Sequence, residues 1–325
     1  MTPMPAADSR RPARRLPDVI TVSAGDERCL RFREFTDGDI AAVARLTSLS
    51  GSRACDFTVG GLYMWIDYFR YRCAFVADTL FVRGASEDDT SLTAFSLPVG
   101  LMPLADSVAL LRRYCDARGM TLRFSAVPED RLDELTALGA RSVAELPDWA
   151  DYVYDAGALA SLSGKKLNKK RNHVNRFMAD NPGYTLRDIT AADIPSLLAF
   201  LDSLPHDPSK SLMADYEREQ TARVLRNYGA YPFVGAILST PSRGIVAFTV
   251  GEVIGDTLHL HIEKADHTVA GAGEAINTLF ARLMTARKGS IALINRQDDA
   301  GDPGLRAAKL SWHPALILRK FNVIF

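Results

Sequence analysis

Thr257-Leu-His-Leu-His-Ile-Glu-Lys264 alternates apolar and polar side chains, and Ile291-Ala-Leu-Ile-Asn-Arg-Gln-Asp-Asp299 follows it after a helical pattern from Gly273 to Arg287. Successive side chains of a strand point to opposite sides, so the first segment predicts a strand with one apolar face and one polar face. The second segment predicts another strand that ends in a polar cluster. The predicted apolar face carries Leu258, Leu260 and Ile262, and the predicted polar face carries His259, His261 and Glu263.

The polar face of the first strand is the first candidate for a functional site. Ligands of open α/β sheets bind beyond the carboxyl ends of the strands, and both predicted strands end in polar residues. Two structural interpretations stay open, namely a solvated sheet face and core histidines that bond to backbone carbonyls. Zinc would need a further ligand at a characteristic spacing, and the sequence offers none, so no metal is expected. The candidate catalytic residues are His261, Glu263, Asn295, Asp298 and Asp299.

The composition predicts a soluble globular protein. The chain has 325 residues, of which 47% are hydrophobic and 24% charged, which is sufficient for two ordinary domains. The formal net charge is +0, so any contact with nucleic acid or an anionic membrane must use a local patch. No apolar run is long enough for a signal peptide or a membrane span. The four cysteines contain no Cys-x-x-Cys pair and predict buried thiols in a reducing cytoplasm. They are Cys29, Cys55, Cys73 and Cys115.

An internal repeat predicts the domain organisation. Arg33-Glu-Phe-Thr-Asp-Gly-Asp-Ile40 aligns without a gap with Arg187-Asp-Ile-Thr-Ala-Ala-Asp-Ile194. In both copies a threonine suited to a helix N-cap precedes by three residues an aspartate that favours the first turn. Two copies of one opening imply two copies of one domain, and strands first grouped and then alternating with helices predict a mixed α/β sheet in each. The expected parts are a disordered basic, proline-rich tail (1–27), a first domain (28–157), a basic linker helix (158–183) and a catalytic domain (184–325).

The linker concentrates positive charge in a chain without net charge. On a helix, Gly164-Lys-Lys-Leu-Asn-Lys-Lys-Arg-Asn-His173 would place Lys166, Lys169, Lys170 and His173 on one face. A solvated helix face is one interpretation. The other is a contact with tRNA phosphates, because a polyanion would relieve the repulsion between these charges. The candidate tRNA-binding residues of the linker are Lys165, Lys166, Lys169, Lys170 and Arg171.

Several linked motifs carry a resemblance to a known family. They are the basic linker segment, His261-Ile-Glu-Lys-Ala-Asp266, Ala275-Ile-Asn277, Ile294-Asn-Arg-Gln-Asp-Asp299 and Gly304-Leu-Arg-Ala-Ala-Lys-Leu-Ser-Trp-His-Pro314. From about Cys29 onward the chain resembles the family named for the C-terminal domain of phosphatidylglycerol lysyltransferase, although Gln297 stands where glutamate is expected. The resemblance implies two tandem acyltransferase domains of the GCN5-related N-acetyltransferase (GNAT) type. It also implies transfer of an aminoacyl group from a charged tRNA to a lipid hydroxyl.

This chemistry suggests roles for the site residues. His261 or Glu263 would take the proton of the acceptor, and Asn295 would stabilise the oxyanion together with nearby strand N–H groups. Asp298 and Asp299 would hold the α-ammonium of the aminoacyl group. The donor is a substrate, so no cofactor is expected. The acceptor would be a lipid, reached by peripheral membrane contact, or another small hydroxyl or amine compound.

Two further residues and two other functions complete the predictions. Arg306 and Lys309 would face the tRNA end or a phosphate. An acetyl-CoA-dependent acetyltransferase would instead bind the pyrophosphate at the start of a helix, where Gly271 and Gly273 are the candidates, although no glutamine or arginine precedes them at the usual position. A non-catalytic binding module would hold His261 and its neighbours in internal hydrogen bonds with no pocket beside them.

Overall fold

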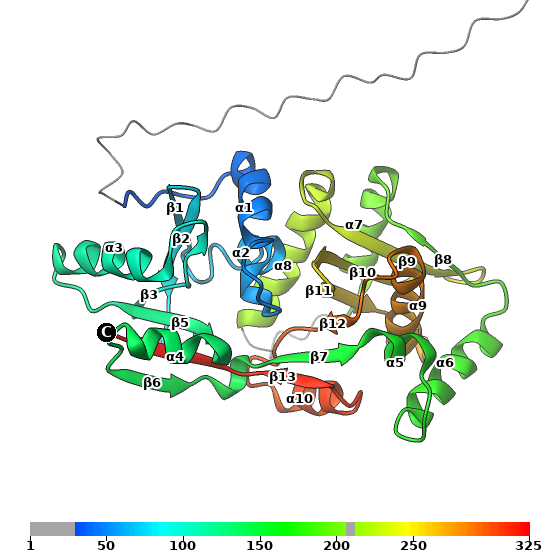
Figure 1. Ribbon diagram of the computed structural model, residues 1–325. Coiled ribbons are helices and arrows are strands. Elements are labelled where there is room, and N and C mark those ends of the chain that lie inside the picture. Colours follow the sequence, from blue (N-terminus) through cyan, green and yellow to red (C-terminus); the bar gives the residue numbers. More distant parts are fainter. Residues whose placement is uncertain (1–29, 206–211) are drawn as a thin grey trace, which may run out of the picture.

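The computed structural model describes residues 30–205 and 212–325, so the expected tail and Cys29 lie outside the described residues. Within these ranges the chain forms two mixed sheets packed with helices, which confirms the predicted α/β class (Figure 1). The helices are α1 (Ile40–Thr47), α2 (Val59–Tyr63), α3 (Leu104–Asp116), α4 (Leu132–Ala137), α5 (Ala156–Ser161), α6 (Asn168–Asp180), α7 (Ile194–Ser203), α8 (Leu212–Arg226), α9 (Ala272–Arg287) and α10 (Pro303–Leu310).

The first sheet has the strand order β1-β2-β3-β5-β14-β6, and β4 pairs with β2. Its only parallel pair is β3 with β5, which meet at Phe95 and Phe124. All of its other described pairs are antiparallel. Its strands are β1 (Arg72–Val76), β2 (Thr79–Ala85), β3 (Thr93–Phe95), β4 (Val99–Gly100), β5 (Arg123–Pro128), β6 (Ser142–Glu145) and β14 (Lys320–Ile324).

The second sheet has the order β8-β9-β10-β11-β12-β7-β13 and repeats the same pattern of directions. Its parallel pair is β11 with β12, flanked on both sides by antiparallel pairs. Along the outer edge of β1, the antiparallel bridge between Arg33 and Cys73 takes the place that β8 has beside β9. The strands of the second sheet are β7 (Asp151–Asp155), β8 (Thr185–Asp188), β9 (Val234–Thr240), β10 (Gly244–Ile254), β11 (Thr257–Ala265), β12 (Leu293–Asn295) and β13 (Leu316–Leu318).

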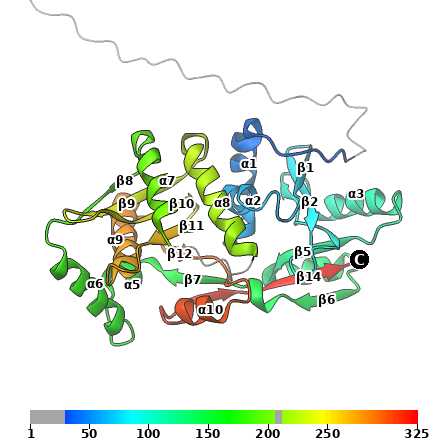
Figure 2. The same ribbon diagram turned by 180° about the vertical axis from the view of Figure 1, so that it is seen from behind.

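The two sheets exchange one strand each. β7 lies before the middle of the chain but pairs with β12 and β13 of the second sheet. β14 lies at the end of the chain but pairs with β5 and β6 of the first sheet (Figure 2). Sheet membership therefore does not follow the expected division into 28–157 and 184–325, because each range contributes a strand to the other sheet.

The repeated segments of the sequence adopt the same local structure. Thr36 and Thr190 are N-caps of short 3₁₀ turns with nearly equal backbone angles, and each forms a capping box with the aspartate three residues later. Arg33 and Arg187 hold those aspartates through paired hydrogen bonds of 2.5–2.7 Å. The capping box removes unsatisfied donors at the start of the helix, so both copies begin α1 and α7 in the same way.

The polar face predicted for β11 is divided by a β-bulge. Val250 pairs with Ile262 and Gly251 pairs with Leu260, which leaves His261 as an extra residue in β11. A bulge shifts the alternation of side chains beyond it. Ile262 therefore packs with the α7 and α8 core, while Leu258 and Leu260 pack on the α9 side. The prediction that Leu258, Leu260 and Ile262 share one face is wrong for this reason.

Candidate functional site

The site is built around the loop that follows β12. β11 and β12 pair only over Thr257–His259 and Leu293–Asn295, after which the two strands are no longer paired. Asn295 Oδ1 accepts a 2.6 Å hydrogen bond from Gln297 N, which closes a tight turn, and Gln297 adopts a positive φ of 61°. This geometry directs the side chains of the loop toward both sides of the sheet.

His261 lies in a buried hydrogen-bond triad on the side of α2. Its Nε2 is 2.9 Å from Glu252 Oε1, and its Nδ1 is 2.8 Å from Gln297 Nε2. Gly60 N also donates to Glu252, at 2.8 Å. Burial is the largest single influence and would raise the pKa of Glu252, but the hydrogen bond and charge of His261 together with the Gly60 N–H outweigh it, so that pKa is lowered. An ionised Glu252 can only accept a hydrogen bond, so it favours the His261 tautomer that carries its hydrogen on Nε2. The Nδ1 of His261 is then the nitrogen with the free lone pair.

Gly60 is required by the packing of this triad. A Cβ built on Gly60 would lie 2.4 Å from the His261 ring. We expect Gly60→Ala to lower the free energy of unfolding by about 1–3 kcal/mol because it overpacks a buried site. Urea denaturation would measure this change. Gly229→Ala is the matched control, since its Cβ would meet no atom within 4 Å. Equal stability of both variants would contradict the prediction.

Glu263 lies on the opposite side of the sheet from His261. It accepts hydrogen bonds from Arg296 Nη2 at 2.9 Å and from Asn277 Nδ2 of α9 at 3.0 Å. The Arg296 guanidinium also lies over the rings of Tyr154 and Trp312. The structure thus separates the two proposed base candidates, because the bulge turns Glu263 toward α9.

Asn295 belongs to a buried polar cluster where the two sheets meet. Its Nδ2 donates to Asp151 Oδ2 at 2.8 Å and to the Arg53 carbonyl at 2.7 Å. The Lys320 ammonium lies 2.8 Å from Asp151 and 2.7 Å from Asp56. It is also 3.4 Å from Cys55 Sγ.

The cluster brings together three side chains that could bind a metal, namely Cys55, Asp56 and Asp151. The Lys320 ammonium contacts all three side chains, so a cation of the protein itself, instead of a bound metal, balances the charge of the two carboxylates. Burial would lower the pKa of Lys320, but Asp151 and Asp56 raise it well above its ordinary value. The buried ammonium is therefore charged and joins the exchanged strands β14 and β7.

His259 is fully buried and forms no hydrogen bond through either ring nitrogen within the described residues. Burial, with a smaller contribution from His261, lowers its pKa to about 4. It is therefore a neutral imidazole at neutral pH.

A pH dependence of stability follows from His259. An unfolded histidine binds its proton near pH 6.5, whereas His259 in the folded chain binds it only near 4. The stability that this difference provides is complete above pH 6.5 and is lost as the pH falls toward 4, by about 3 kcal/mol in total. Urea denaturation between pH 7 and pH 4.5 would measure it. The pH slope should become smaller in His259→Phe, and an unchanged slope would contradict the assignment.

Asp298 and Asp299 have different surroundings. Burial raises the pKa of Asp298 to about 6, and its only described side-chain hydrogen bond is from Ala300 N at 3.1 Å. Asp299 is buried and accepts bonds from Arg306 and from the Tyr152 hydroxyl at 2.5–2.8 Å. Asp299 is thus occupied by internal partners, and Asp298 retains more acceptor capacity.

Arg306 and Lys309 hold the loop rather than face solvent as free cations. Arg306 bonds to Asp299 and to Asp148. Lys309 is buried, and its ammonium donates to the carbonyls of residues 296, 297 and 298. The prediction that Lys309 faces a tRNA phosphate conflicts with these contacts, because its ammonium is buried and its donors are used. Arg306 is 38% exposed and bonds to described residues only through Nε and Nη2, so a phosphate contact through Nη1 stays a prediction.

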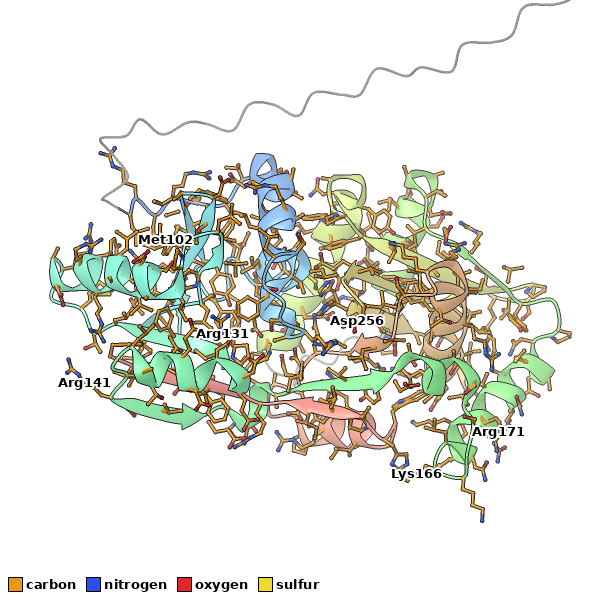
Figure 3. All side chains as sticks on the ribbon, in the orientation of Figure 1. Met102, Arg131, Arg141, Lys166, Arg171 and Asp256 are labelled. Atoms are coloured by element: carbon orange, nitrogen blue, oxygen red, sulfur yellow. The ribbon has the colours of Figure 1, made fainter. Side chains whose placement is uncertain are left out.

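The basic segment lies at the opposite end of the molecule from Arg141 (Figure 3). α6 begins at Asn168, so Lys165 and Lys166 both precede the helix, and Lys166 does not share the helix face predicted for it. Lys165, Lys166 and Lys169 are exposed and form no ion pair with any described residue. Lys170 contacts Glu274 and the Trp312 ring, and Arg171 bonds to the Leu162 carbonyl.

The turn before α9 is covered by α6. A Cβ on Gly271 would lie 2.5 Å from the His173 carbonyl oxygen, and Gly271 has a φ of 79°. Gly273 follows within the first turn of α9, where Glu274 pairs with Lys170 and His173. The start of this helix therefore carries a carboxylate of the chain itself.

Comparison with known proteins identifies the family. Residues 47–324 match the family described as "Phosphatidylglycerol lysyltransferase, C-terminal". The chain belongs to this family. The match confirms the resemblance found in the sequence. Among the described residues of this family member, no helix is both long and apolar enough to cross a membrane.

Two solved structures share the fold of this phosphatidylglycerol lysyltransferase C-terminal family member, and a further protein resembles part of its sequence. A conserved protein of unknown function from Bacteroides thetaiotaomicron is 29% identical, with a TM-score of 0.81, over 91% of this chain and 100% of that chain. L-PGS from Bacillus licheniformis is 14% identical, with a TM-score of 0.58, over 87% and 91% of the two chains. An uncharacterised protein of Mycoplasmoides gallisepticum is 24% identical over 53% of this chain, and the match spans 55% of that relative.

Sequence analysis missed four residues that build the site: Gly60, Asp151, Glu252 and Lys320. Each is a polar residue or glycine inside or beside an apolar strand or helix. Lys320, in the run Leu316-Ile-Leu-Arg-Lys-Phe-Asn-Val-Ile-Phe325, gave the clearest signal, because a lysine in a buried strand requires a partner. Which residues would be its partners depends on the strand exchange, which no local pattern encodes.

Proposed function

We propose that this protein transfers an aminoacyl group from a charged tRNA to a hydroxyl or amine of a small acceptor. The support is its membership of the phosphatidylglycerol lysyltransferase C-terminal family together with the exposed, unpaired lysines that precede and begin α6. A cluster of exposed cations without partners in a chain of zero net charge suits a phosphate backbone.

The start of α9 favours aminoacyl-tRNA over acetyl-CoA as the donor. Pyrophosphate binding at a helix start needs free N–H groups and a positive field. Here the His173 carbonyl lies against Gly271, and Glu274 places a carboxylate in the first turn. Acetyl-CoA would have to displace α6 from this turn and approach that carboxylate.

The reaction exchanges one ester for an ester or amide. The acceptor oxygen or nitrogen attacks the aminoacyl carbonyl carbon, the bond from that carbon to the ribose oxygen breaks, and the acceptor proton passes to the ribose oxygen. We assign His261 as the base, because Glu252 fixes its tautomer. The ring is fully buried, so the Gln297 side chain has to leave Nδ1 before an acceptor can reach it.

Both Nδ2 hydrogens of Asn295 already bond to Asp151 and to the Arg53 carbonyl, so we assign Asn295 a positioning role in place of the oxyanion role. Asp298 remains the proposed partner of the α-ammonium, and Asp299 positions the loop through Arg306.

An aminoacyl-tRNA transfer assay tests this function. The protein would be incubated with a set of labelled aminoacyl-tRNAs and with lipid and amine acceptors, and labelled acetyl-CoA would be run in parallel. We expect labelled product from at least one aminoacyl-tRNA and none from acetyl-CoA. Product from acetyl-CoA alone would overturn the proposal.

The basic segment gives a separate prediction. We expect the triple variant Lys165→Glu, Lys166→Glu and Lys169→Glu to bind tRNA more weakly, and the slope of log K against log salt to become shallower by about 0.7–0.9 for each phosphate that the variant no longer neutralises. Filter binding across salt concentrations would measure both quantities. The control reverses three exposed arginines and lysines elsewhere, at Arg113, Arg141 and Lys288. Equal slopes for the two triple variants would show that tRNA binds at another surface.

A further inference from the structure

The His261 ring is completely enclosed by its neighbours, and its side chain has no exposed surface. The backbone of Gly60 closes one edge, because a Cβ on Gly60 would lie 2.4 Å from the ring. The centroids of the Phe233 and His261 rings are 5.6 Å apart. Glu252 occupies Nε2, and Gln297 occupies Nδ1. A molecule that reaches Nδ1 must therefore displace one of these four neighbours.

Gln297 is the neighbour with the fewest contacts to lose. Glu252 is 3% exposed and also accepts the Gly60 N–H, and Phe233 stacks on a neighbouring aromatic ring with a centroid distance of 4.9 Å. The Gln297 side chain is half-buried, and its bond to His261 is its only hydrogen bond within the described ranges. Rotation of this side chain breaks that one bond. Movement of any of the other three would disturb α2, a second buried hydrogen bond or the stacked rings.

The backbone of Gln297 is held firmly, so its side chain can move by itself. Its N–H donates to Asn295 Oδ1 at 2.6 Å. Its carbonyl accepts from Tyr152 N at 3.1 Å and from Lys309 Nζ at 3.2 Å. These bonds keep Gln297 at a φ of 61°, a left-handed conformation that is costly for residues other than glycine and that occurs preferentially at functional sites. A change of side-chain rotamer leaves all three bonds in place.

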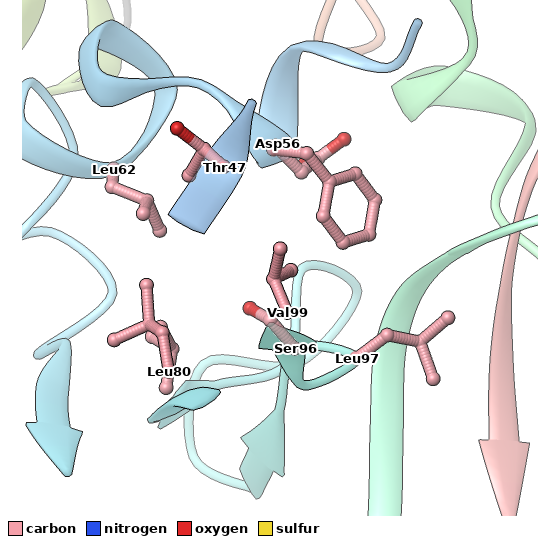
Figure 4. A pocket seen from close by; sticks show the side chains of 9 residues that line it. Thr47, Asp56, Leu62, Leu80, Ser96, Leu97 and Val99 are labelled. Carbon is pink, nitrogen blue, oxygen red and sulfur yellow. The ribbon is translucent and has the colours of Figure 1, made fainter. Parts of the chain in front are cut away.

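The first half of the chain has the same turn without these two side chains. Counted from the last residue pair between the two parallel strands of each sheet, Leu97 corresponds to His261 and Ala126 to Gln297. Ala126 has a φ of 54°, so this turn accommodates an alanine. Leu97 lines a slot of about 10 Å³, which has the room of about one water molecule (Figure 4). The first half thus has neither an imidazole nor an amide at these positions.

A base that is open to water would waste the donor. An aminoacyl ester hydrolyses when a water oxygen attacks its carbonyl carbon, the bond from that carbon to the ribose oxygen breaks, and a proton of water passes to the ribose oxygen. Water would gain at Nδ1 only the one hydrogen bond that Gln297 loses. An acceptor makes further contacts, and their binding energy can move the amide as the hydroxyl or amine approaches Nδ1. Exclusion of water from an active site prevents such side reactions.

We propose that Gln297 is a gate on His261. In the resting protein its amide covers Nδ1, and a bound acceptor replaces the amide with its own hydroxyl or amine, so that water does not reach the base while the donor is bound. This gate rests on the proposed aminoacyl transfer and on His261 as its base. Gln297 acts through His261 and is a positioning residue.

Chemical modification tests the gate without any tRNA. Diethyl pyrocarbonate reacts with the free lone pair of a neutral imidazole, and tandem mass spectrometry would measure its addition to each histidine of the wild type, Gln297→Ala and Gln297→Glu. We expect His261 to react faster in Gln297→Ala by about two- to tenfold, the effect of losing one neutral hydrogen bond. It should react more slowly in Gln297→Glu, because a carboxylate favours a proton on Nδ1 and forms a stronger, charge-assisted bond. Equal rates at His261 in the three proteins would overturn the proposal.

Two other histidines separate a gate from a general loosening of the fold. His313 is exposed, so its rate should be the same in all three proteins. His259 is buried on the same strand as His261, and its ring forms no hydrogen bond with any described residue. His259 should stay unreactive in Gln297→Ala. If His259 and His261 both react faster in that variant, the substitution loosens the sheet and the gate is wrong.

The gate and the transfer reaction can fail independently. With a labelled aminoacyl-tRNA, Gln297→Ala should release about twofold or more free amino acid for each aminoacyl group transferred, because Nδ1 is uncovered more often. If transfer occurs with an unchanged share of hydrolysis, the proposed function stands and the gate falls. If no aminoacyl-tRNA is used but His261 alone becomes more reactive in Gln297→Ala, the cover over Nδ1 stands and the proposed function falls.

Discussion

Replacing Lys320 with methionine is expected to lower the free energy of unfolding by about 3–5 kcal/mol. The substitution keeps most of the side-chain volume but leaves Asp56 and Asp151 without their cation, and Lys320 and Asp151 are almost completely buried. Removing one partner of a buried ion pair leaves an uncompensated charge, which costs more than the loss of an exposed pair. Urea denaturation near neutral pH would measure the change.

The control for Lys320→Met is Lys169→Met. Lys169 is exposed and forms no ion pair with a described residue, so we expect a change within about 0.5 kcal/mol. If Lys320→Met proves as stable as the wild type, Asp56 and Asp151 do not carry the charges assigned to them. The double variant Lys320→Met with Asp151→Asn should recover part of the loss, because it removes one of the two orphaned carboxylates.

Replacing His261 with asparagine should slow aminoacyl transfer by about 100- to 10,000-fold, the range for loss of a general base. The amide retains a hydrogen-bond donor toward Glu252 but cannot take up a proton at neutral pH. tRNA affinity should stay unchanged, since the exposed lysines lie elsewhere. Single-turnover rates with a saturating donor would separate the chemical step from binding.

Two controls make the His261 result specific. His313 is exposed, and His313→Asn should leave transfer unchanged. Glu252→Gln should reduce transfer by less than His261→Asn and shift the pH profile, because it removes the carboxylate that selects the tautomer. If His261→Asn retains full activity while Glu263→Gln loses it, Glu263 is the base and the site lies on the α9 side of the sheet.

Much of the fold could be predicted from the sequence because its signals are local. The capping boxes at Thr36 and Thr190 depend on residues three apart, and both form as the aligned segments indicate. The α/β class follows from the strand and helix periods. The family followed from short linked motifs between Gly164 and Pro314.

The candidate site could be predicted only in part because its contacts are long-range. The alternation in β11 correctly marked His261 and Glu263 as polar residues inside a sheet, but a bulge sends them to opposite sides. Glu252, Gly60 and Lys320 reach the site from other elements, and their roles depend on tertiary contacts. Arg306 and Lys309 were expected to face the tRNA end or a phosphate, whereas both bind the loop that follows β12.

The exchange of β7 and β14 has a consequence for how the protein must be made. In the first sheet, β14 lies between β5 and β6, yet residues 146 to 319 separate it from β6 along the chain. A ribosome delivers β14 after every other described strand, so the first sheet keeps an unfilled gap with open edges while the second half is synthesised. Folding of the two halves is thus obligately coupled: the first half cannot mature during translation as an independent unit, and a chain cut between the halves would leave both sheets incomplete.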